Sequence, residues 1–556
     1  MNPVDSTAPT ALASPTASTA SGRPQQPSVP TRPKLDPELA PDLRTPLRRW
    51  MLGLGLSVLS GLMLVWSMEG YHIEGLIFIG FVPALVAQHR VLPRRWSGLG
   101  FGIPVGILFQ GYLGPGLSNA DLAWYLYVYG LWIALFVAAI AWRSRGFHSR
   151  TGYRWFVLST PLAYVAFEFV RTNMTEVFGG SWGMLPYALY ERPGILQPVS
   201  ITGIHGMTLL LLLINFGIAR VVLTQLDERL GPPDGRAPLT RAAARRDGRV
   251  ITAVTVGWVV LSLALLDNIH VDVFDPLPEN TVRVAAIQPD PYDIEGIDRV
   301  LAGEIDADDI SISEQEKLRR NIEQTVFAAN QGAELVVWYE GGLKFDPSGP
   351  EGEPIRALAD EHNIYLAVGW QSPTEGGRYN EVATFSPDGE FLGSYGKSHP
   401  GEFAGDFSAR QGDYLVYDAP FGRFGSIICF DLDFLDSARN VAKLGANILA
   451  VSSNDVPGIA DKHYTHLVFR SIESRLATVK ADSAFDSAIT DPYGRILDAY
   501  VNQYTGRATL VADVQVGSGD TFYVRFGDWF AWLALAGSLV FLGVGAQSRW
   551  GRREPS

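Results

Sequence analysis

Cysteine is almost absent from this sequence: Cys429 is the only one in 556 residues. A single cysteine cannot close a disulfide within the chain, and it cannot supply the Cys-rich ligand sets of structural zinc sites. Cys429 lies in the stretch Gly425–Phe434 (GSIICFDLDF), where an apolar, strand-like run delivers its side chain to a turn. It is therefore either a small core residue or a nucleophile.

Basic residues are scarce in one long part of the chain. Val271–Gly527 contains 41 acidic and 20 basic residues, a charge of −21, while the remaining residues contain 17 acidic and 25 basic ones, a charge of +8; the sum is the −13 of the whole chain. So acidic a segment argues against nucleic acid as a partner, because nucleic acids are bound mainly through positive charge.

Large apolar side chains are almost absent from residues 1–43, which are rich in proline, serine, threonine and alanine. Such a composition cannot bury enough apolar surface to offset the entropy lost when a chain becomes ordered. We therefore predict a disordered tail over 1–43.

Apolar runs of membrane-spanning character follow this tail. Seven precede the acidic segment and one follows it. The predicted spans are Trp50–Trp66, Ile73–Val91, Gly98–Leu113, Leu122–Trp142, Trp155–Val170, Val199–Val222, Val250–Leu266 and Trp529–Leu542. So many runs predict a multi-pass α-helical membrane bundle rather than a soluble protein with buried helices.

Arginine is unevenly distributed among the loops between these runs. The loops after the second, fourth and sixth runs and both chain ends near the membrane are arginine-rich, whereas the alternate loops hold almost no basic residues, with Arg192 as the exception. The arginines on the rich side are Arg48, Arg49, Arg90, Arg94, Arg95, Arg143, Arg145, Arg150, Arg229, Arg236, Arg241, Arg245, Arg246, Arg249, Arg549, Arg552 and Arg553. Positively charged loops stay in the cytoplasm, so both termini are predicted inside and the acidic lobe outside.

These patterns divide the chain into five parts. The predicted parts are a cytoplasmic tail (1–43), a seven-span membrane domain (44–268), an extracytoplasmic lobe (271–527), a final span (528–548) and a second cytoplasmic tail (549–556). The protein is therefore expected to be an integral protein of a cytoplasmic membrane.

Strand-like and helix-like segments alternate in the acidic lobe, which predicts layered α/β packing. The predicted strands are Val282–Gln288, Leu335–Trp338, Tyr365–Gly369, Glu381–Phe385, Phe391–Tyr395, Ser426–Cys429 and Ile448–Ser452. The predicted helices are Glu314–Asn330, Pro354–Glu361, Phe434–Leu444 and Tyr464–Lys480.

Three of these strands end next to a chemically active side chain. Glu340 follows Leu335–Trp338, Lys397 follows Phe391–Tyr395, and Cys429 ends its own strand. Taken singly, each has an ordinary explanation: a solvated loop acid, an edge-protecting lysine and an inert core cysteine. Together they suit nucleophilic catalysis, because a thiol needs a base to become a thiolate and a cation to stabilise the thiolate and an oxyanion.

At these residues the sequence resembles a known family. WYE, GKSHPGE and ICFDLDF are similar to the Glu-Lys-Cys motifs of the nitrilase (carbon–nitrogen hydrolase) superfamily, and seven spans before such a domain with one after it resemble the apolipoprotein N-acyltransferases. FEFVR, GGSWGMLPYAL and QPVSITGIHGMTLLLLLINF are similar to that family's membrane segments. The resemblance covers roughly Arg48 to Gly543 and implies a nitrilase-like αββα sandwich seated on the membrane bundle.

The resemblance also implies a reaction and its partners. A membrane phospholipid would acylate Cys429 as a thioester, and the N-terminal amine of a diacylglyceryl-cysteine apolipoprotein would then accept the acyl chain, without a cofactor. Glu340 would be the base and Lys397 the oxyanion stabiliser. The membrane is then the cytoplasmic (inner) membrane of a bacterium, and the protein is expected to be monomeric.

The family's pattern assigns further positions. The matching supporting residues are Glu402, Phe430 and Asp431, and the matching lipid or substrate contacts in the membrane half are Glu168, Arg171 and Trp182. Asp431 stands where the family usually has a glutamate, so its side chain is one methylene shorter. An arginine at a span end and an interfacial tryptophan also have purely structural explanations.

Three other functions remain open on the sequence alone. A membrane-tethered amidase would use the same triad with water as acceptor, although seven N-terminal spans exceed what an anchor needs. A non-catalytic binding protein would form no acyl-enzyme. A zinc enzyme could use His463 and His466, which lie three residues apart, with His399 and Glu402 near Lys397, but the spacing lacks the HExxH pattern.

Overall fold

The structure is a computed structural model that describes residues 46–118, 128–174, 180–233, 236–266, 280–292, 310–375, 377–401, 411, 413–456, 458–502 and 506–550. The predicted disordered tail, residues 1–43, lies outside this range. So do Glu402 and residues 551–556 of the predicted C-terminal tail.

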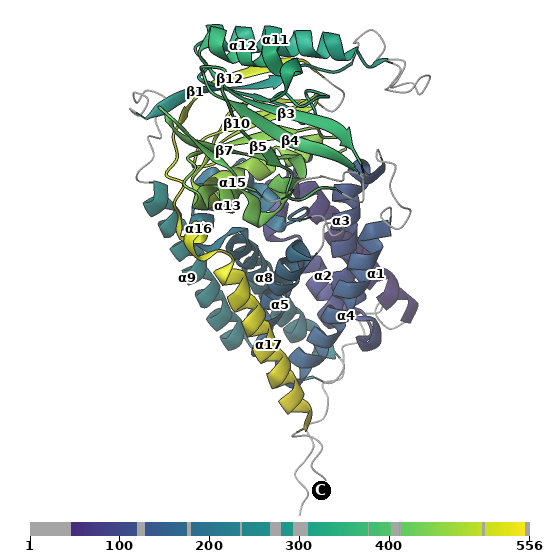
Figure 1. Cartoon of the computed structure of the whole chain (residues 1–556). Coiled ribbons are helices and arrows are strands. Elements are labelled where there is room, and N and C mark those ends of the chain that lie inside the picture. Colours follow the sequence, from purple (N-terminus) through teal and green to yellow (C-terminus); the bar gives the residue numbers. More distant parts are fainter. Residues whose placement is uncertain are drawn as a thin grey trace, which may run out of the picture.

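Two layers of different architecture make up the molecule: a bundle of helices and, above it in Figure 1, a domain of two β-sheets. The long helices of the bundle are α1 (Pro46–Ser67), α3 (Leu99–Ser118), α4 (Tyr129–Arg150), α5 (Phe156–Asn173), α8 (Ile204–Leu230), α9 (Arg241–Leu266) and α17 (Trp529–Trp550). The short ones are η2 (Glu74–Phe78), α2 (Val82–Val86), η3 (Ala87–Val91), η4 (Arg94–Trp96), η7 (Leu185–Leu189), α6 (Pro193–Leu196) and α7 (Val199–Thr202).

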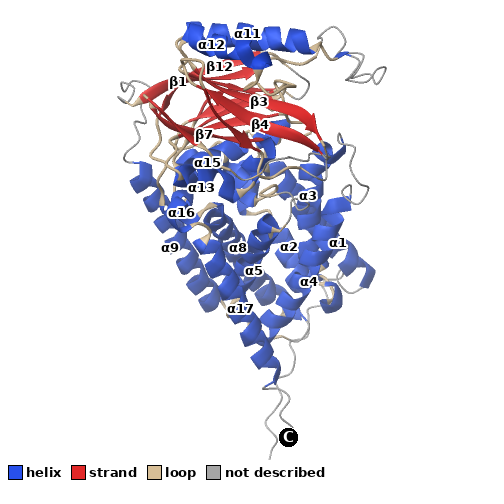
Figure 2. Cartoon of the chain, viewed as in Figure 1, coloured by secondary structure: helices blue, strands red, loops and turns tan. Residues whose placement is uncertain are grey.

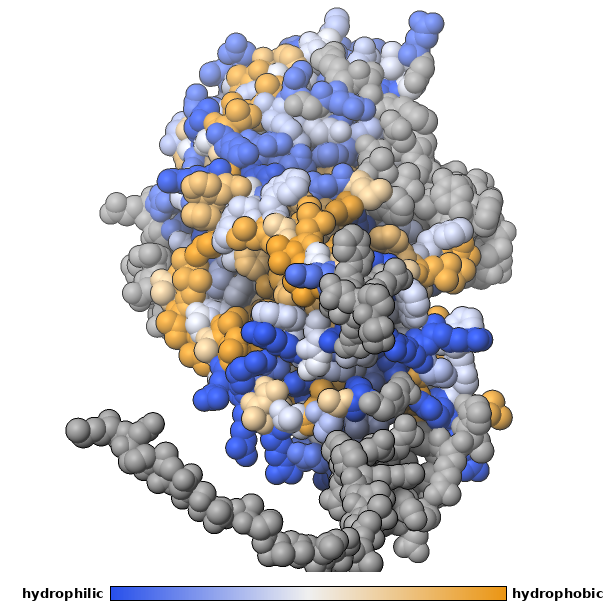
Figure 3. Space-filling view, turned by 90° about the horizontal axis from the view of Figure 1, so that it is seen from below, coloured by the Kyte–Doolittle hydropathy of each residue, from blue (hydrophilic) through white to orange (hydrophobic). Residues whose placement is uncertain are grey.

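Several helices of the bundle are suited to a bilayer. Among the described residues, four helices are long and apolar enough to cross a membrane: Leu47–Ser67, Ile204–Leu230, Arg241–Leu266 and Trp529–Gln547. Their outward faces carry exposed large apolar side chains such as Val260 and Leu263 on α9 and Trp532 and Val540 on α17. Seen from below in Figure 3, orange hydrophobic side chains border a cluster of blue hydrophilic ones. Exposed apolar surface of this extent marks contact with lipid or protein.

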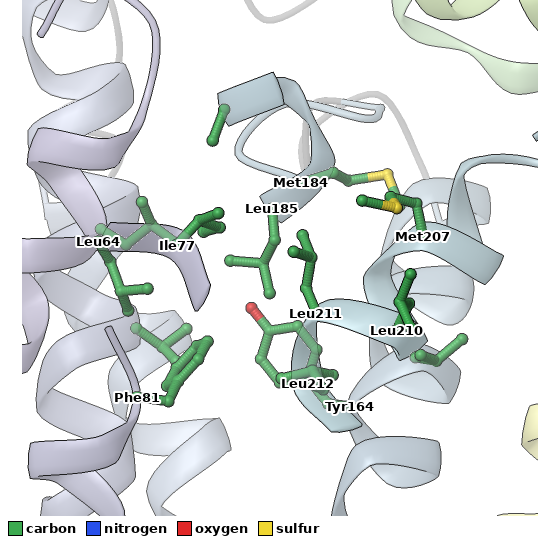
Figure 4. Close-up of a cluster of buried hydrophobic side chains, with 14 of the residues drawn as sticks. Leu64, Ile77, Phe81, Tyr164, Met184, Leu185, Met207, Leu210, Leu211 and Leu212 are labelled. Carbon is green, nitrogen blue, oxygen red and sulfur yellow. The ribbon is translucent and has the colours of Figure 1, made fainter. Parts of the chain in front are cut away.

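The second predicted span, Ile73–Val91, is wrong as one continuous helix. The structure breaks it into η2, α2 and η3. At the break, the side-chain amide of Asn215 in α8 accepts from the Phe81 N–H (2.9 Å) and donates to the Ile77 carbonyl (2.8 Å). Broken backbone is tolerated at membrane depth only where neighbouring side chains satisfy its polar groups. Figure 4 shows Ile77 and Phe81 in a buried apolar cluster to which Leu64 and Tyr164 also belong.

The sixth predicted span, Val199–Val222, is also divided. Gly203 lies between α7 and α8 with a φ of +65°, a conformation that favours glycine. The backbone N–H of Ile204, at the start of α8, donates to Glu473 Oε1 of the sheet domain (2.8 Å). A carboxylate from the other layer therefore satisfies an N-terminal amide of this membrane helix.

The upper domain contains two six-stranded sheets. The first has the order β12 (Ala508–Gln515), β1 (Thr281–Gln288), β2 (Leu335–Trp338), β3 (Tyr365–Thr374), β4 (Gly377–Phe385) and β5 (Phe391–Gly396). The second has the order β11 (Ile496–Val501), β10 (Asp486–Thr490), β9 (Ala477–Asp482), β8 (Ile448–Ser453), β7 (Gly422–Ile428) and β6 (Val416–Ala419). In each sheet three central strands are parallel and the flanking ones antiparallel.

Helices cover the outer face of both sheets (Figure 2). α11 (Glu314–Asn330) and α12 (Glu353–His362) lie on the first sheet, and α13 (Leu435–Lys443) and α15 (Thr465–Ser474) lie between the second sheet and the bundle. α11 packs Leu318, Ile322, Val326 and Ala329 against the first sheet, and Ser313 caps its first turn by accepting from the Glu316 N–H. The predicted αββα sandwich is therefore confirmed.

The predicted helix Tyr464–Lys480 is too long. α15 ends at Ser474, Arg475 takes the left-handed conformation (φ +49°), and β9 begins at Ala477. The segment Ala477–Asp482 (ATVKAD) includes two β-branched residues and is completely buried. It pairs with β8 as a parallel strand.

Candidate active site

Three strand ends bring a buried Glu340, a buried Lys397 and a partly buried Cys429 to one region of the sandwich. Glu340 lies two residues past β2, Lys397 directly after β5, and Cys429 directly after β7. The Lys397 Nζ atom lies 2.9 Å from Glu340 Oε1, and both side chains are almost completely buried. The sheets meet here: the Ser452 hydroxyl donates to the Trp338 carbonyl (2.7 Å), and the Glu340 N–H donates to the Ser453 carbonyl (3.2 Å).

Asn380 in β4 holds the Glu340–Lys397 pair in place. Its side-chain amide donates to Glu340 Oε1 (2.6 Å), and its carbonyl accepts from the Lys397 N–H (3.0 Å). One strand therefore positions both charged groups. Asn380 is not apparent from the sequence, because an asparagine inside a strand carries no signal of its own.

Cys429 sits at a sharp turn between β7 and the short helix η13 (Cys429–Asp433). Its φ of +44° lies in the left-handed region, which a non-glycine residue occupies at a cost of about 1–3 kcal/mol. Such strain persists only where the surroundings enforce it, and it is found mainly at functional sites.

The carboxylate of Asp431 fastens this turn. It accepts from the Ile428 N–H (2.9 Å), the Tyr395 hydroxyl (2.8 Å) and the His399 N–H (2.8 Å). The aspartate therefore reaches three donors and ties the cysteine turn to the segment that follows Lys397. Phe430 is partly buried and packs edge-to-face on Phe434, with ring centroids 5.1 Å apart.

The thiol is held in its neutral form. Burial raises the pKa of Cys429 well above its ordinary value, and the negative charges of Glu340 and Asp455 raise it further, while Lys397 opposes them. Each of these charges acts on the sulfur, so all three predicted residues lie within electrostatic reach of one another. A base must remove the thiol proton when the sulfur attacks.

A second carboxylate, Asp455, contacts the nucleophile directly. The Cys429 thiol donates to Asp455 Oδ1 at a Sγ–O distance of 3.5 Å, and the same carboxylate accepts from Lys480 Nζ (2.9 Å) and His463 Nδ1 (2.7 Å). Burial opposes the charge, but the cations His463 and Lys480 hold the pKa of Asp455 well below its usual range. Asp455 also follows a buried strand, β8, so its place at a strand end is visible in the sequence, although its contact with Cys429 is not.

His463 and His466 are buried between this site and the bundle. His463 Nδ1 bonds Asp455, and His466 Nδ1 lies 2.6 Å from Asp433 Oδ1. Burial lowers the pKa of His463, but Asp455 and Asp433 together raise it above its ordinary value. Burial lowers the pKa of His466 to about 4, although Asp433 opposes it. The Nδ1 atom of each histidine already contacts a carboxylate, Asp455 for His463 and Asp433 for His466. His399 lies elsewhere, stacked on Phe434 at a centroid distance of 3.8 Å.

The predicted contacts in the membrane half lie beneath this network. Arg171 in α5 is buried and donates to the carbonyls of Gly180 and Trp182, each at 2.9 Å. The Trp182 ring packs on His466, with centroids 4.7 Å apart. Glu168 is fully buried one turn before Arg171. Arg171 therefore orders the loop that presents Trp182 to the sandwich, and does not snorkel to the surface.

Comparison with known proteins gives two family matches. Residues 283–522 match the carbon-nitrogen hydrolase family, and residues 60–217 match the apolipoprotein N-acyltransferase N-terminal domain.

Individual relatives agree with both matches. An apolipoprotein N-acyltransferase from Geobacter metallireducens is 27% identical over 87% of this chain and 94% of its own length. A nitrilase from Pyrococcus abyssi is 30% identical over 36% of this chain and 74% of its own length. Among solved structures, an amidase from Nesterenkonia sp. is 20% identical and covers 44% of this chain and 92% of its own, with a TM-score of 0.34.

The two matched segments lie on the two layers of the structure, the first on the helical bundle and the second on the αββα sandwich that carries Cys429. This chain therefore belongs to the apolipoprotein N-acyltransferases, within the carbon–nitrogen hydrolase (nitrilase) superfamily.

Proposed function

We propose that this protein transfers a fatty acyl chain from a membrane phospholipid, through a thioester on Cys429, to the N-terminal amine of diacylglyceryl-cysteine apolipoproteins. The observation that supports it best is the juxtaposition of the Cys429 thiol with the Glu340–Lys397 pair, in a domain seated directly on a bundle of apolar helices. Relatives that are named apolipoprotein N-acyltransferase match both layers of the chain.

In the first half-reaction, Glu340 takes the thiol proton as the sulfur attacks the ester carbonyl of the phospholipid. Lys397 stabilises the resulting oxyanion, and the proton is returned to the departing alkoxide, which leaves as lysophospholipid. Asp455, held ionised by His463 and Lys480, aligns the thiol by accepting its hydrogen bond.

In the second half-reaction, the neutral α-amine of the apolipoprotein attacks the thioester. Glu340 accepts the amine proton, the C–S bond breaks, and the thiol is regenerated as an amide forms. Both substrates are lipid-anchored, so a nucleophile seated just above the bundle can meet them in turn. We expect Glu402, Phe430 and Asp431 to support the site and Glu168, Arg171 and Trp182 to lie near the lipid.

The first experiment detects the acyl-enzyme. Purified full-length protein incubated with labelled phospholipid should gain one acyl chain on Cys429 by mass spectrometry, and a diacylglyceryl-peptide amine should remove it as the N-acyl peptide. Cys429→Ala should gain none, and Glu340→Gln should acylate at least roughly a hundredfold more slowly. An adduct released only by water would support the amidase alternative, and no adduct in the wild type would refute both functions.

We further propose that both termini are cytoplasmic, that 271–527 lies outside the inner membrane between the seven-span domain (44–268) and the last span (528–548), and that the protein is monomeric. The arginine-rich loops support this orientation. Because Cys429 is the only cysteine, a Cys429→Ser background allows single-site labelling. A membrane-impermeant maleimide should label Glu351→Cys in intact spheroplasts but Arg245→Cys only after lysis; the reverse pattern would overturn the orientation.

A further inference from the structure

A turn of the membrane bundle, residues 180–182, touches the backbone that carries the nucleophile. The Ser181 N–H donates to the Asp433 carbonyl (2.8 Å), and Asp433 is the last residue of η13, the short helix that begins at Cys429. Gly180 makes the closest approach, since a Cβ atom at this glycine would lie 2.7 Å from the Asp433 carbonyl oxygen. Its φ of +50° also favours glycine. The bundle and the nucleophile's helix are therefore in direct backbone contact.

The 180–182 turn is itself fixed by α5. The guanidinium group of Arg171 donates to the carbonyls of Gly180 and Trp182, each at 2.9 Å. Ser181 is fully buried, and its hydroxyl lies 2.7 Å from the Tyr187 hydroxyl. Because the guanidinium is a rigid, planar fork, two bonds from it hold the turn in one conformation.

The Trp182 side chain reaches the thiol by a second route. Its ring packs on the rings of His463 and His466, with centroids 5.4 and 4.7 Å away. His466 Nδ1 contacts Asp433 Oδ1 (2.6 Å). His463 Nδ1 contacts the carboxylate of Asp455 (2.7 Å), which accepts the hydrogen bond of the thiol. The turn therefore touches both the end of η13 and a residue that holds the acceptor of the thiol.

Cys429 needs such support because its conformation is strained. A φ of +44° costs about 1–3 kcal/mol and is kept only where the surroundings enforce it. Asp431, in the middle of η13, is hydrogen-bonded to the sandwich. The five residues of η13 form fewer than two turns of a 3₁₀-helix, at about three residues a turn, so a displacement of Asp433 is passed on to Cys429. The sandwich holds the middle of this helix, and the bundle holds its end.

We propose that the 180–182 turn is a positioning element of the active site, which keeps Cys429 in its strained conformation and its thiol on Asp455. Arg171 and Gly180 are then positioning residues, which act on the sulfur through η13. The bundle supplies part of the active-site geometry, which a single membrane anchor would not. This role concerns the thiol itself, so it does not depend on the proposed acyl donor.

Alkylation of the only cysteine by iodoacetamide, measured against pH on full-length protein in detergent without lipid, tests this role. Gly180→Ala places a methyl group against the Asp433 carbonyl and should move the sulfur away from Asp455. Farther from that negative charge the pKa of Cys429 falls, so alkylation at pH 8 should be about threefold faster or more, the effect of about half a pKa unit.

The matched control is Gly152→Ala. Gly152 has a similar φ of +61°, but among the described residues no atom beyond its own chain neighbours lies within 4 Å of its Cβ position. The same substitution there strains the backbone without touching η13, and it should keep the wild-type alkylation profile.

A second pair of variants loosens the turn without adding bulk. Arg171→Met removes both donors and should shift the profile in the same direction as Gly180→Ala, while Arg171→Lys, which can still reach one carbonyl, should shift it less. Each variant is measured below its unfolding midpoint, with and without Asp455→Asn. Because the shift arises from Asp455, it should vanish in the Asp455→Asn background, whereas the effect of a generally loosened fold would persist there.

Three results would each overturn the proposal. They are equal profiles for Gly180→Ala and Gly152→Ala, a wild-type profile for Arg171→Met, and a shift that survives in the Asp455→Asn background.

Discussion

At the scale of single residues, the site is a balance of charges around one sulfur. Burial and two carboxylates keep the Cys429 thiol protonated, while the positive charge of Lys397 favours the thiolate. A resting thiol is less reactive toward adventitious electrophiles than a thiolate. In the proposed mechanism, the reaction then depends on Glu340 to accept the thiol proton as the carbonyl carbon is attacked.

Two substitutions should therefore move the thiol pKa in opposite directions. Lys397→Met removes the favourable charge and should raise the pKa of Cys429, whereas Asp455→Asn removes an unfavourable one and should lower it. The pH profile of alkylation by iodoacetamide measures this pKa. Asp360→Asn, an exposed acid on α12, is the control and should leave the profile in place. Shifts of the same sign in both variants would contradict the charge balance.

The sequence could locate part of this site and not the rest. Glu340, Lys397 and Cys429 are visible as active side chains at strand ends, and the family motifs group them. Asn380 and Asp455 act through hydrogen bonds to residues 40 and 26 positions away in the chain, Glu340 and Cys429 respectively. Each contact joins strands of one sheet: Asn380 in β4 meets the end of β2, and Asp455 after β8 meets the end of β7. Strand order and register decide such contacts, and local patterns do not encode either of them.

At the scale of elements, local periodicity predicted α11 and β2 to the residue but not the two divided membrane segments. Hydropathy records only that a run is apolar. Whether the backbone inside it is one helix depends on partners elsewhere, here the Asn215 amide for Ile77 and Phe81 and the Glu473 carboxylate for Ile204. The helix predicted to extend to Lys480 ends early for the same reason. The residues from Ala477 onward pair with strand β8 and form β9 instead.

Asn215→Ala should test the first of these partners. It leaves the Phe81 N–H and the Ile77 carbonyl without their amide partner. Each unsatisfied buried polar group costs about 1–3 kcal/mol, so the free energy of unfolding should fall by about 2–6 kcal/mol. Asn173→Ala is the control, since that amide donates only to a carbonyl and a hydroxyl of its own helix end. Unfolding in a detergent titration should separate the two variants; equal stability would show that the break needs no such support.

At the scale of the whole molecule, the sandwich and the bundle share a buried interface. Leu435, Val468, Phe469 and Ile472 of the sandwich helices belong to the same apolar cluster as the membrane helices. Polar contacts add to it: the Ser181 N–H donates to the Asp433 carbonyl at 2.8 Å. Cys429 is therefore held at a fixed height above the bundle, as a reaction with lipid esters requires.

Glu69 makes this interface sensitive to pH. It follows α1 and accepts from the Tyr112 hydroxyl (3.0 Å) of the bundle and from the Thr465 hydroxyl (2.9 Å) of α15. Burial raises the pKa of Glu69 to about 7, against which these hydrogen bonds and the charge of Lys462 act. The folded state therefore binds this proton more tightly than the unfolded chain does.

Stability should consequently fall as the pH rises from about 4.5 to about 7, and then level off, with a total effect of up to roughly 3 kcal/mol. Glu69→Gln should remove this part of the slope, which unfolding midpoints between pH 5 and pH 8 would measure. Glu351→Gln, at an exposed site remote from the interface, should keep the wild-type slope. A slope that survives in Glu69→Gln would assign the pH dependence to other groups.

The sequence alone determined the membrane character, the acidic lobe, the alternating strands and helices and the residues proposed to carry the chemistry, because each of these depends on composition or on spacing along the chain. Only the tertiary structure decided which groups surround the sulfur, where the apolar runs break, and how the sandwich joins the bundle. Those features depend on how sheets and helices that are distant in sequence pack together. The energy of each such contact depends on the geometry of both segments that make it.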